Sequence, residues 1–498
     1  MPEVEAGVAP GWVRMCRVAD ICFMPARELA ALVRGREISA VEVLEAFLDR
    51  IATTNPAVNA IVTLEPDAAR KSAEAADKRA ARGEPLGALH GLPLAVKDLE
   101  ETAGIRTTMG SPIFSEHVPQ ADSHLVTRLK RAGAVVIGKT NTPEFGAGSH
   151  TFNRVFGPTR NPYDLRRSAG GSSGGAAAAV ACGMLPLADG SDLGGSLRNP
   201  ASFCNVVGVR PSPGLVPVTD AADLWDPMSV HGPIARSVDD AAFLLSAMAG
   251  TDRPAPLTFR AGHPFDRPRR PAGPVRVAWS GTLGGLPVEP AAAEVLEARR
   301  TDLQAIGWQV DEVELDLAGA DEAFEVLRAL AYVSDLGDLY ETSRHLMKDT
   351  VVWNIEQGLA LGPERIARAL RFRSDIFRSV AGLLADHDVL AAPAAQVLPF
   401  PVEVEWPREV AGRRMTHYIE WMRACSRVTV SSHPALSVPA GFAQDGLPVG
   451  LQLVGGFRRD ADLLGLASVF EEATGYGRVR PPAPADADAV QPAPEPAS

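Results

Sequence analysis

The chain has 498 residues, of which 46% are hydrophobic and 22% are charged, with a formal net charge of −12 at pH 7. This length and composition allow a large buried core, so we expect a globular protein built as one large α/β unit or as two or three domains. The negative charge and the lack of clustered Lys and Arg argue against a nucleic-acid-binding surface, and small molecules or proteins are the expected partners.

The N-terminus and the cysteines give no indication of export. Residues 1–24 lack the charged start and unbroken apolar core of a secretory signal. No segment approaches the roughly 20 apolar residues that a membrane-spanning helix requires. The cysteines are odd in number and lack the paired spacing of zinc sites; they are Cys16, Cys22, Cys182, Cys204 and Cys425. We therefore expect a cytoplasmic protein with reduced thiols and no membrane contact.

The N-terminal part of the chain alternates predicted helices and strands. Helices are expected over residues 26–34 and 40–51, and the second is preceded by Ser39, which can form a capping box with Glu42. The elements that follow are a strand over 59–64, a strand over 92–96 that ends at Lys97, a helix over 122–132 and a strand over 134–138. This rhythm is typical of parallel strands covered by helices.

The C-terminal half continues the alternation after a change in composition. Residues 252–273 are rich in Pro and Arg and are predicted to form a surface loop or linker. The predicted elements beyond it are strands over 275–279, 308–315, 389–393, 435–440 and 449–454 and helices over 290–306, 321–345 and 363–386. The Pro/Ala-rich tail over 481–498 is expected to be disordered.

Two glycine loops that carry serines lie near the middle of the chain, at residues 170–175 and 192–196. Such tracts are commonly flexible linkers. The Ala-rich segment over 176–187 between them, however, is predicted to be a helix followed by a short apolar run, so both loops flank buried elements. A serine nucleophile needs a base and backbone N–H groups that face the oxyanion. These loops and Lys97 together can supply both.

Two competing interpretations of the same region are weaker. Residues 170–174 match the G-x-S-x-G elbow of α/β-hydrolases, but that elbow follows a buried strand, whereas residues 161–168 are polar and interrupted by proline. Cys204 lies near the loops and is more consistent with a core position than with a nucleophile.

The histidines do not suggest a second chemistry. They lack the spacing of metal ligands and have no acidic partner nearby in the sequence, so neither a Ser-His-Asp triad nor a metal site is predicted; the four considered are His150, His231, His417 and His433. No cofactor is expected.

Several motifs in a fixed order make the chain resemble the amidase signature hydrolases over about residues 26–454. They are residues 91–98 (GLPLAVKD), 138–145 (GKTNTPEF), 170–175 (GGSSGG), 190–198 (GSDLGGSLR) with Pro200, Phe203 and Cys204, and 446–452 (GLPVGLQ). The resemblance implies one α/β domain over 1–480, with a mixed, largely parallel central sheet covered on both faces by helices. It places the signature core at about 85–215 and a helical substrate-entrance region at about 320–390.

The resemblance also implies a Ser-cisSer-Lys triad. Ser196 would be the nucleophile, Ser172 the bridging serine with a cis peptide bond, and Lys97 the base. To accept a proton near pH 7, Lys97 must have its pKa lowered by about three units from the usual ~10.4, which burial can do. The competing interpretation is that Lys97 lies at the surface or pairs with Asp98, as single lysines more commonly do.

The remaining site residues fall into three groups. The backbone from Leu193 through Gly194 and Gly195 to Ser196 is expected to form an oxyanion hole, because two glycines let successive N–H groups converge. Support for the loops is expected from Ser173, Ser191, Asp192 and Arg198, with Ser191 at a position where the family most often has Thr. Substrate contacts are expected from Met109, Gly110, Phe145, Gly170 and Gly171, with residues 332–358, including Tyr340 and Trp353, at the entrance and residues 393–401 near the leaving group.

The expected reaction is acyl transfer from a small carboxamide to Ser196, followed by hydrolysis of the acyl-enzyme. An apolar lining favours aryl or alkyl amides, and carbamates, urethanes and esters are further candidates. One alternative is the A subunit of a tRNA-dependent amidotransferase. Another is a binding protein on an inactive scaffold, which the presence of Lys97, Ser172 and Ser196 together disfavours. The protein is expected to be a monomer or a homodimer.

Overall fold

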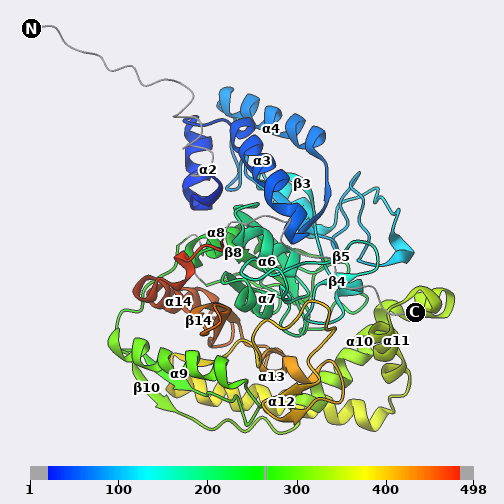
Figure 1. The fold of residues 1–498 in the computed structure, drawn as a ribbon, viewed down its shortest axis with the longest axis vertical. Coiled ribbons are helices and arrows are strands. Elements are labelled where there is room, and N and C mark those ends of the chain that lie inside the picture. Colours follow the sequence, from blue (N-terminus) through cyan, green and yellow to red (C-terminus); the bar gives the residue numbers. More distant parts are fainter. Residues whose placement is uncertain (1–20, 263–264, 266, 483–498) are drawn as a thin grey trace, which may run out of the picture.

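The computed structural model describes residues 21–262, 265 and 267–482 (Figure 1). Within them the strands form one large and one small sheet, besides two short two-stranded ribbons. The large sheet has the spatial order β10 (Gln309–Glu312), β9 (Arg276–Trp279), β11 (Val389–Pro393), β15 (Pro448–Val454), β14 (Ala435–Phe442), β7 (Val207–Arg210), β8 (Val230–Ala235) and β6 (Leu187–Asp192). The small sheet has the order β1 (Ile61–Leu64), β3 (Val135–Thr140) and β2 (Pro93–Lys97).

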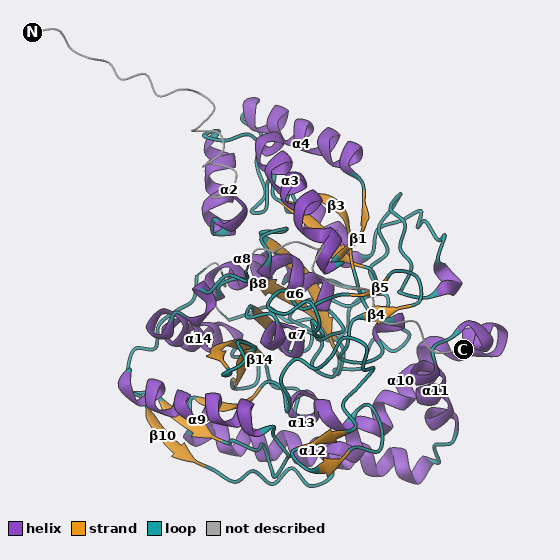
Figure 2. Ribbon diagram, in the orientation of Figure 1, coloured by secondary structure: helices purple, strands orange, loops and turns teal. Residues whose placement is uncertain are grey.

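Helices surround these strands, as Figure 2 shows. They are α2 (Ala26–Gly35), α3 (Ala40–Val58), α4 (Pro66–Ala81), α5 (His124–Arg131), α6 (Gly174–Ala181), α7 (Arg198–Phe203), α8 (Val238–Met248), α9 (Pro290–Ala305), α10 (Ala320–Ser343), α11 (Asp349–Leu359), α12 (Pro363–Asp386), α13 (Arg423–Val430) and α14 (Asp460–Thr474). The predicted α/β class and mixed sheet are confirmed. None of the helices in the described part of the chain is both long and apolar enough to span a bilayer.

The expectation that the central sheet is largely parallel is wrong. In the large sheet only β9 pairs in parallel, with β10 and with β11, and the five other pairings are antiparallel. The reason lies in the connections, because antiparallel neighbours need no crossover helix. β14 and β15 are joined by residues 443–447, and β7 and β8 by the helix-free residues 211–229. The parallel unit predicted from residues 92–138 is confirmed as β2, α5 and β3.

Local sequence signals account for several elements. Ser39 and Glu42 form the predicted capping box at the start of α3, with Ser39 Oγ accepting the Glu42 N–H at 3.0 Å. Helix α5 buries Leu125, Val126 and Leu129 on one face. The entrance region over 332–358 contains the end of α10 and nearly all of α11, as a helical entrance region requires.

One hydrophobic cluster includes residues from both sheets, for example Val96 in β2, Ile234 in β8 and Leu451 in β15. The Pro/Arg-rich segment over 252–273 is attached to this body, because Ala255 and Phe265 are buried and the Phe259 N–H donates to the Gly214 carbonyl. In its described part it is therefore a packed loop. The predicted tail lies almost entirely outside the described residues, as does Cys16.

Replacing Gly175 with Ala is expected to destabilise the protein, because a Cβ there would lie 2.7 Å from the Ala60 carbonyl oxygen and still closer to the backbone of Asn141. The free energy of unfolding should fall by about 1–3 kcal/mol, as in overpacked cores. Gly382→Ala is the matched control, since this exposed α12 glycine has open space around its Cβ position and should gain about 0.5–1 kcal/mol. Chemical denaturation measures both changes, and equal effects would contradict this account of α6 packing.

Candidate active site

Lys97 is the last residue of β2 and is completely buried. Its Nζ lies at hydrogen-bonding distance from three serine hydroxyls: 2.7 Å from Ser172 Oγ, 2.9 Å from Ser173 Oγ and 3.0 Å from Ser191 Oγ. Asp98 is not its partner, because that carboxylate accepts the backbone N–H of Thr108 at 3.1 Å and the hydroxyl of the same residue. The amine therefore meets a ring of neutral hydroxyls.

The surroundings of Lys97 favour its uncharged form. Burial lowers the pKa of Lys97 to about 8, although the carboxylates of Asp189, Glu100 and Asp192 act in the opposite direction. With this pKa, about a tenth of the molecules carry a neutral amine at pH 7. A neutral amine keeps one lone pair and can accept a proton from a serine hydroxyl.

The first glycine loop turns tightly against the protein interior. The peptide bond between Gly171 and Ser172 is cis. A Cβ on Gly171 would lie 2.9 Å from the His150 backbone nitrogen, and one on Gly170 would lie 2.8 Å from Asn199 Oδ1. Neither glycine is among the residues that line the cavity described below. Their contribution is the close approach that places Ser172 beside Lys97.

The second glycine loop is held by a buried ion-pair network. Asp192 Oδ1 lies 2.8 Å from Arg198 Nη2 and 3.3 Å from Arg210 Nη1, and all three side chains are completely buried. Burial alone would raise the pKa of Asp192, but the two guanidinium groups outweigh it and hold that pKa well below its usual range. The same carboxylate also accepts the N–H of Gly195 at 2.9 Å.

This contact changes the expected set of oxyanion donors. Because the Gly195 N–H already donates to Asp192, it is not free to bind a substrate oxygen. The N–H groups of Leu193, Gly194 and Ser196 have no acceptor among the residues that the structure describes. A larger residue at position 194 would displace neighbouring side chains, since a Cβ there would lie 2.7 Å from Met422 Cε and 2.8 Å from Phe324 Cζ.

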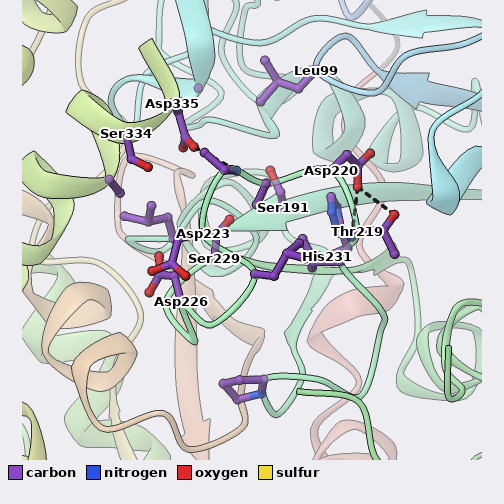
Figure 3. A pocket seen from close by; sticks show the side chains of 18 of the residues that line it. Leu99, Ser191, Thr219, Asp220, Asp223, Asp226, Ser229, His231, Ser334 and Asp335 are labelled. Atoms are coloured by element: carbon purple, nitrogen blue, oxygen red, sulfur yellow. Dashed lines mark hydrogen bonds between the residues drawn. The ribbon is translucent and has the colours of Figure 1, made fainter. Parts of the chain in front are cut away.

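Both loops open onto one cavity of about 1230 Å³, seen close by in Figure 3. Ser172, Ser191 and Ser196 line it together, and the Ser173 N–H donates to the Ser196 carbonyl at 3.2 Å, which ties the loops to each other. Apolar side chains that line the same cavity are Leu99, Met109, Phe145 and Leu193. Gly110 does not line it, because its Cβ position faces the Thr142 carbonyl oxygen at 2.9 Å.

The outer walls of the cavity come partly from the predicted entrance region over about 320–390 and partly from a loop that the sequence did not single out. They are the loop from Pro213 to Asp226, the cavity-facing residues of α10 and three residues of α12. Tyr332 lines the cavity as expected, but Tyr340 donates its hydroxyl to Glu356 and Trp353 stacks on His417 instead. No residue of 393–401 lines the cavity. The loop from Pro213 to Asp226 follows the signature motifs directly in the chain, and this position is the one sequence signal that could have pointed to its role in the cavity wall.

The histidines acquire acidic neighbours that sequence distance concealed. His231 Nδ1 lies 3.3 Å from Glu100 Oε1, and His417 Nε2 lies 3.5 Å from Glu325 Oε1. His150 and His433 are buried, and burial lowers the pKa of each to about 4. Among the described residues, no three His, Cys, Asp or Glu side chains are placed to hold a metal ion together.

The cysteine near the loops is not placed for catalysis. Cys204 is fully buried, its thiol donates to the Ala169 carbonyl at 3.4 Å, and burial raises its pKa well above the usual value. A thiol of this kind is inert at neutral pH. Cys204 is also not among the residues that line the cavity.

Comparison with known proteins shows which sequences and folds this chain is similar to. The family model for Amidase matches residues 42–464. An acylamidase of Rhodococcus erythropolis is 35% identical over 468 residues, covering 93% of this chain and 98% of the relative. The A subunit of glutamyl-tRNA(Gln) amidotransferase from Moorella thermoacetica is 36% identical over 494 residues, covering 93% of this chain and 99% of the relative.

A solved structure gives the same result at the level of the fold. A bacterial aryl acylamidase, described as one of the amidase signature enzymes, superposes with a TM-score of 0.86 at 29% identity, covering 92% of this chain and 97% of that one. The chain belongs to the amidase signature family. It is accordingly an enzyme of the class that hydrolyses the C–N bond of linear amides.

Asp192→Asn is expected to lower the free energy of unfolding by about 3–5 kcal/mol, because it leaves Arg198 and Arg210 buried without a counter-charge. The control is Asp375→Asn, which breaks the exposed pair with Arg378 and should change stability by less than about 1 kcal/mol. Chemical denaturation compares the two variants. A loss at Asp192 no larger than that at Asp375 would show that the network does not hold the loop.

Proposed function

We propose that this chain is a free-standing amidase that hydrolyses the C–N bond of a small carboxamide through a serine acyl-enzyme. The observation that carries the proposal is the buried Lys97 amine, which lies 2.7 Å from Ser172 Oγ at the base of the cavity that Ser196 also lines. Nucleophilic catalysis by a serine needs a base, and it can use a second hydroxyl as a proton relay. Lys97 would be the base, Ser172 the relay and Ser196 the nucleophile.

In this mechanism Ser196 Oγ attacks the amide carbonyl, and its proton passes through Ser172 to the neutral amine of Lys97. The N–H groups of Leu193, Gly194 and Ser196 bind the oxyanion of the tetrahedral intermediate. When the intermediate collapses, the proton returns from Lys97 through Ser172 to the departing nitrogen, and the C–N bond breaks. Water then attacks the ester by the same relay and releases the carboxylic acid.

The lining of the cavity supports an apolar substrate near the serines. Leu99, Met109, Phe145 and Leu193 offer hydrocarbon surface there, which favours aryl and alkyl groups over polar ones. The similarity to an acylamidase and to an aryl acylamidase supports amides of this kind. Carbamates, urethanes and esters remain within the proposal, because the same addition and collapse would cleave them.

A second candidate is supported by the similarity to the A subunits of amidotransferases. Such a protein would hydrolyse glutamine and pass ammonia to a partner. Assay of the purified chain against aryl amides, alkyl amides, carbamates, esters and glutamine, with its oligomeric state measured in parallel, separates the two. Turnover of aryl or alkyl amides by a monomer or homodimer supports the amidase. Activity on glutamine alone, and only with a second protein bound, would overturn it.

Ser196→Ala and Lys97→Ala are each expected to lower kcat/KM by roughly 10³-fold or more, because removal of one member disables the whole relay. Ser229→Ala is the control, since this serine lines the same cavity outside the hydroxyl ring around Lys97. It should stay within a few-fold of the parent. Steady-state kinetics on an aryl amide give the comparison, with circular dichroism to verify folding. Full turnover in a folded Ser196 or Lys97 variant contradicts the assignment.

The value of kcat/KM is expected to rise with pH and to level off above about pH 8. The base must be unprotonated, and burial lowers the pKa of Lys97 to about 8, so each pH unit below that value should cost about tenfold. Measurement between about pH 6 and pH 9.5 on a substrate that does not itself titrate gives the profile. A flat profile across this range would exclude Lys97 as the base.

A further inference from the structure

Three arginine side chains of the described chain are almost completely buried, and one of them differs from the others in its partners. Arg198 and Arg210 share the carboxylate of Asp192. Arg328 is 3% exposed, yet no carboxylate of the described residues lies within 4.0 Å of its nitrogens. Buried charges in proteins are normally paired with an opposite charge, so this guanidinium is an exception that needs an explanation.

The protein partners of Arg328 are neutral. Its Nε donates to Asn354 Oδ1 at 3.3 Å, and its Nη2 donates to the hydroxyls of Tyr332 at 3.0 Å and Tyr418 at 2.8 Å. Burial raises the pKa of Tyr332 despite the nearby guanidinium, so that hydroxyl stays protonated at neutral pH. The Nη1 group has no acceptor among the described residues.

Arg328 lines the cavity beside the nucleophile loop. It lies one helical turn after Phe324 in α10, and its Cζ is 6.0 Å from the centroid of the Phe324 ring. That ring in turn packs against Gly194, where a Cβ would come within 2.8 Å of it. The guanidinium, whose Nη1 group has no acceptor among the described residues, is therefore separated from the loop of Ser196 by about one aromatic ring.

We propose that Arg328 binds a carboxylate of the substrate, so that the natural amide carries a free carboxylate a few bonds from the scissile carbonyl. This inference rests on the proposed function. A guanidinium presents paired N–H groups in a planar fork that matches a carboxylate, and an ion pair formed in a buried site is screened little by salt. The Nη1 group supplies donors that the protein leaves open, and the carboxylate supplies the missing negative charge.

The outer part of the cavity carries acidic side chains, which Figure 3 shows at Asp220, Asp223, Asp226 and Asp335. They oppose the entry of an anion. Asp220 and Asp223 are exposed, however, so their effect on an approaching ligand is screened at physiological ionic strength. Arg328 acts after the ligand has left water, where its attraction is stronger.

The test uses two pairs of anilides whose members differ only in charge. In the first pair the charge is on the amine side: 4-acetamidobenzoate is compared with 4-acetamidoacetophenone. In the second it is on the acyl side: glutaranilate is compared with 5-oxohexananilide. In each neutral member a methyl ketone of similar size and planarity replaces the carboxylate. Release of the aromatic amine by the full chain gives kcat/KM for all four.

At least one pair is expected to favour its carboxylate member roughly tenfold or more, the usual effect of hydrogen bonds to a charged group. Arg328→Gln should abolish this preference. Arg368→Gln is the control. Arg368 pairs with Glu322 between α10 and α12, and neither residue lines the cavity. This variant also loses one guanidinium and should keep the preference. If Arg328→Gln does not fold, the ratios of the parent enzyme decide.

The inference is overturned if the neutral member is the better substrate in both pairs, or if the preference survives in Arg328→Gln. Turnover of the neutral anilides that disappears in Ser196→Ala would still establish the amidase, so the two proposals fail separately. Absence of turnover for all four anilides and for the wider set of amides above overturns both.

Discussion

The contact on which this structure depends is that of a buried lysine amine with three serine hydroxyls. Lys97 has no exposed surface and lies within 3.0 Å of Ser172, Ser173 and Ser191. Holding its pKa at about 8 instead of 10.5 costs the fold about 3 kcal/mol. The buried strand β2 carries Lys97, the close approach of the chain at Gly171 precedes Ser172 and Ser173, and β6 carries Ser191.

The second glycine loop depends on one carboxylate in a similar way. Asp192 binds two guanidinium groups and the backbone N–H groups of Gly195 and Leu197, so the loop is fixed from inside the protein. A rigid loop keeps its remaining N–H groups oriented before the substrate arrives, which is what electrostatic stabilisation of an oxyanion requires. The second glycine loop and Lys97 are thus both positioned by buried polar contacts rather than by apolar packing alone.

The sequence was informative where the decisive residues are close together in the chain. The capping box at Ser39, the apolar face of α5 and the two serine loops all follow from local patterns. The antiparallel majority of the large sheet does not, because β7 pairs with β14 across more than 200 residues. Tertiary contacts also decide which donors are free: the Gly195 N–H is occupied by Asp192, and Ser191 contacts Lys97 instead of merely supporting a loop. Tyr332 follows Arg328 by one helical turn in α10, but the other two partners of Arg328, Asn354 and Tyr418, come from segments that no spacing rule links to it.

The walls of the cavity have a different origin from its floor. The floor is made by the serine loops and β2, whereas much of the outer wall is the helix-free segment from Pro213 to Asp226. This segment contributes no atom to the hydroxyl ring around Lys97. Changes in its length or residues can therefore alter which molecules enter while the hydrolytic step stays the same.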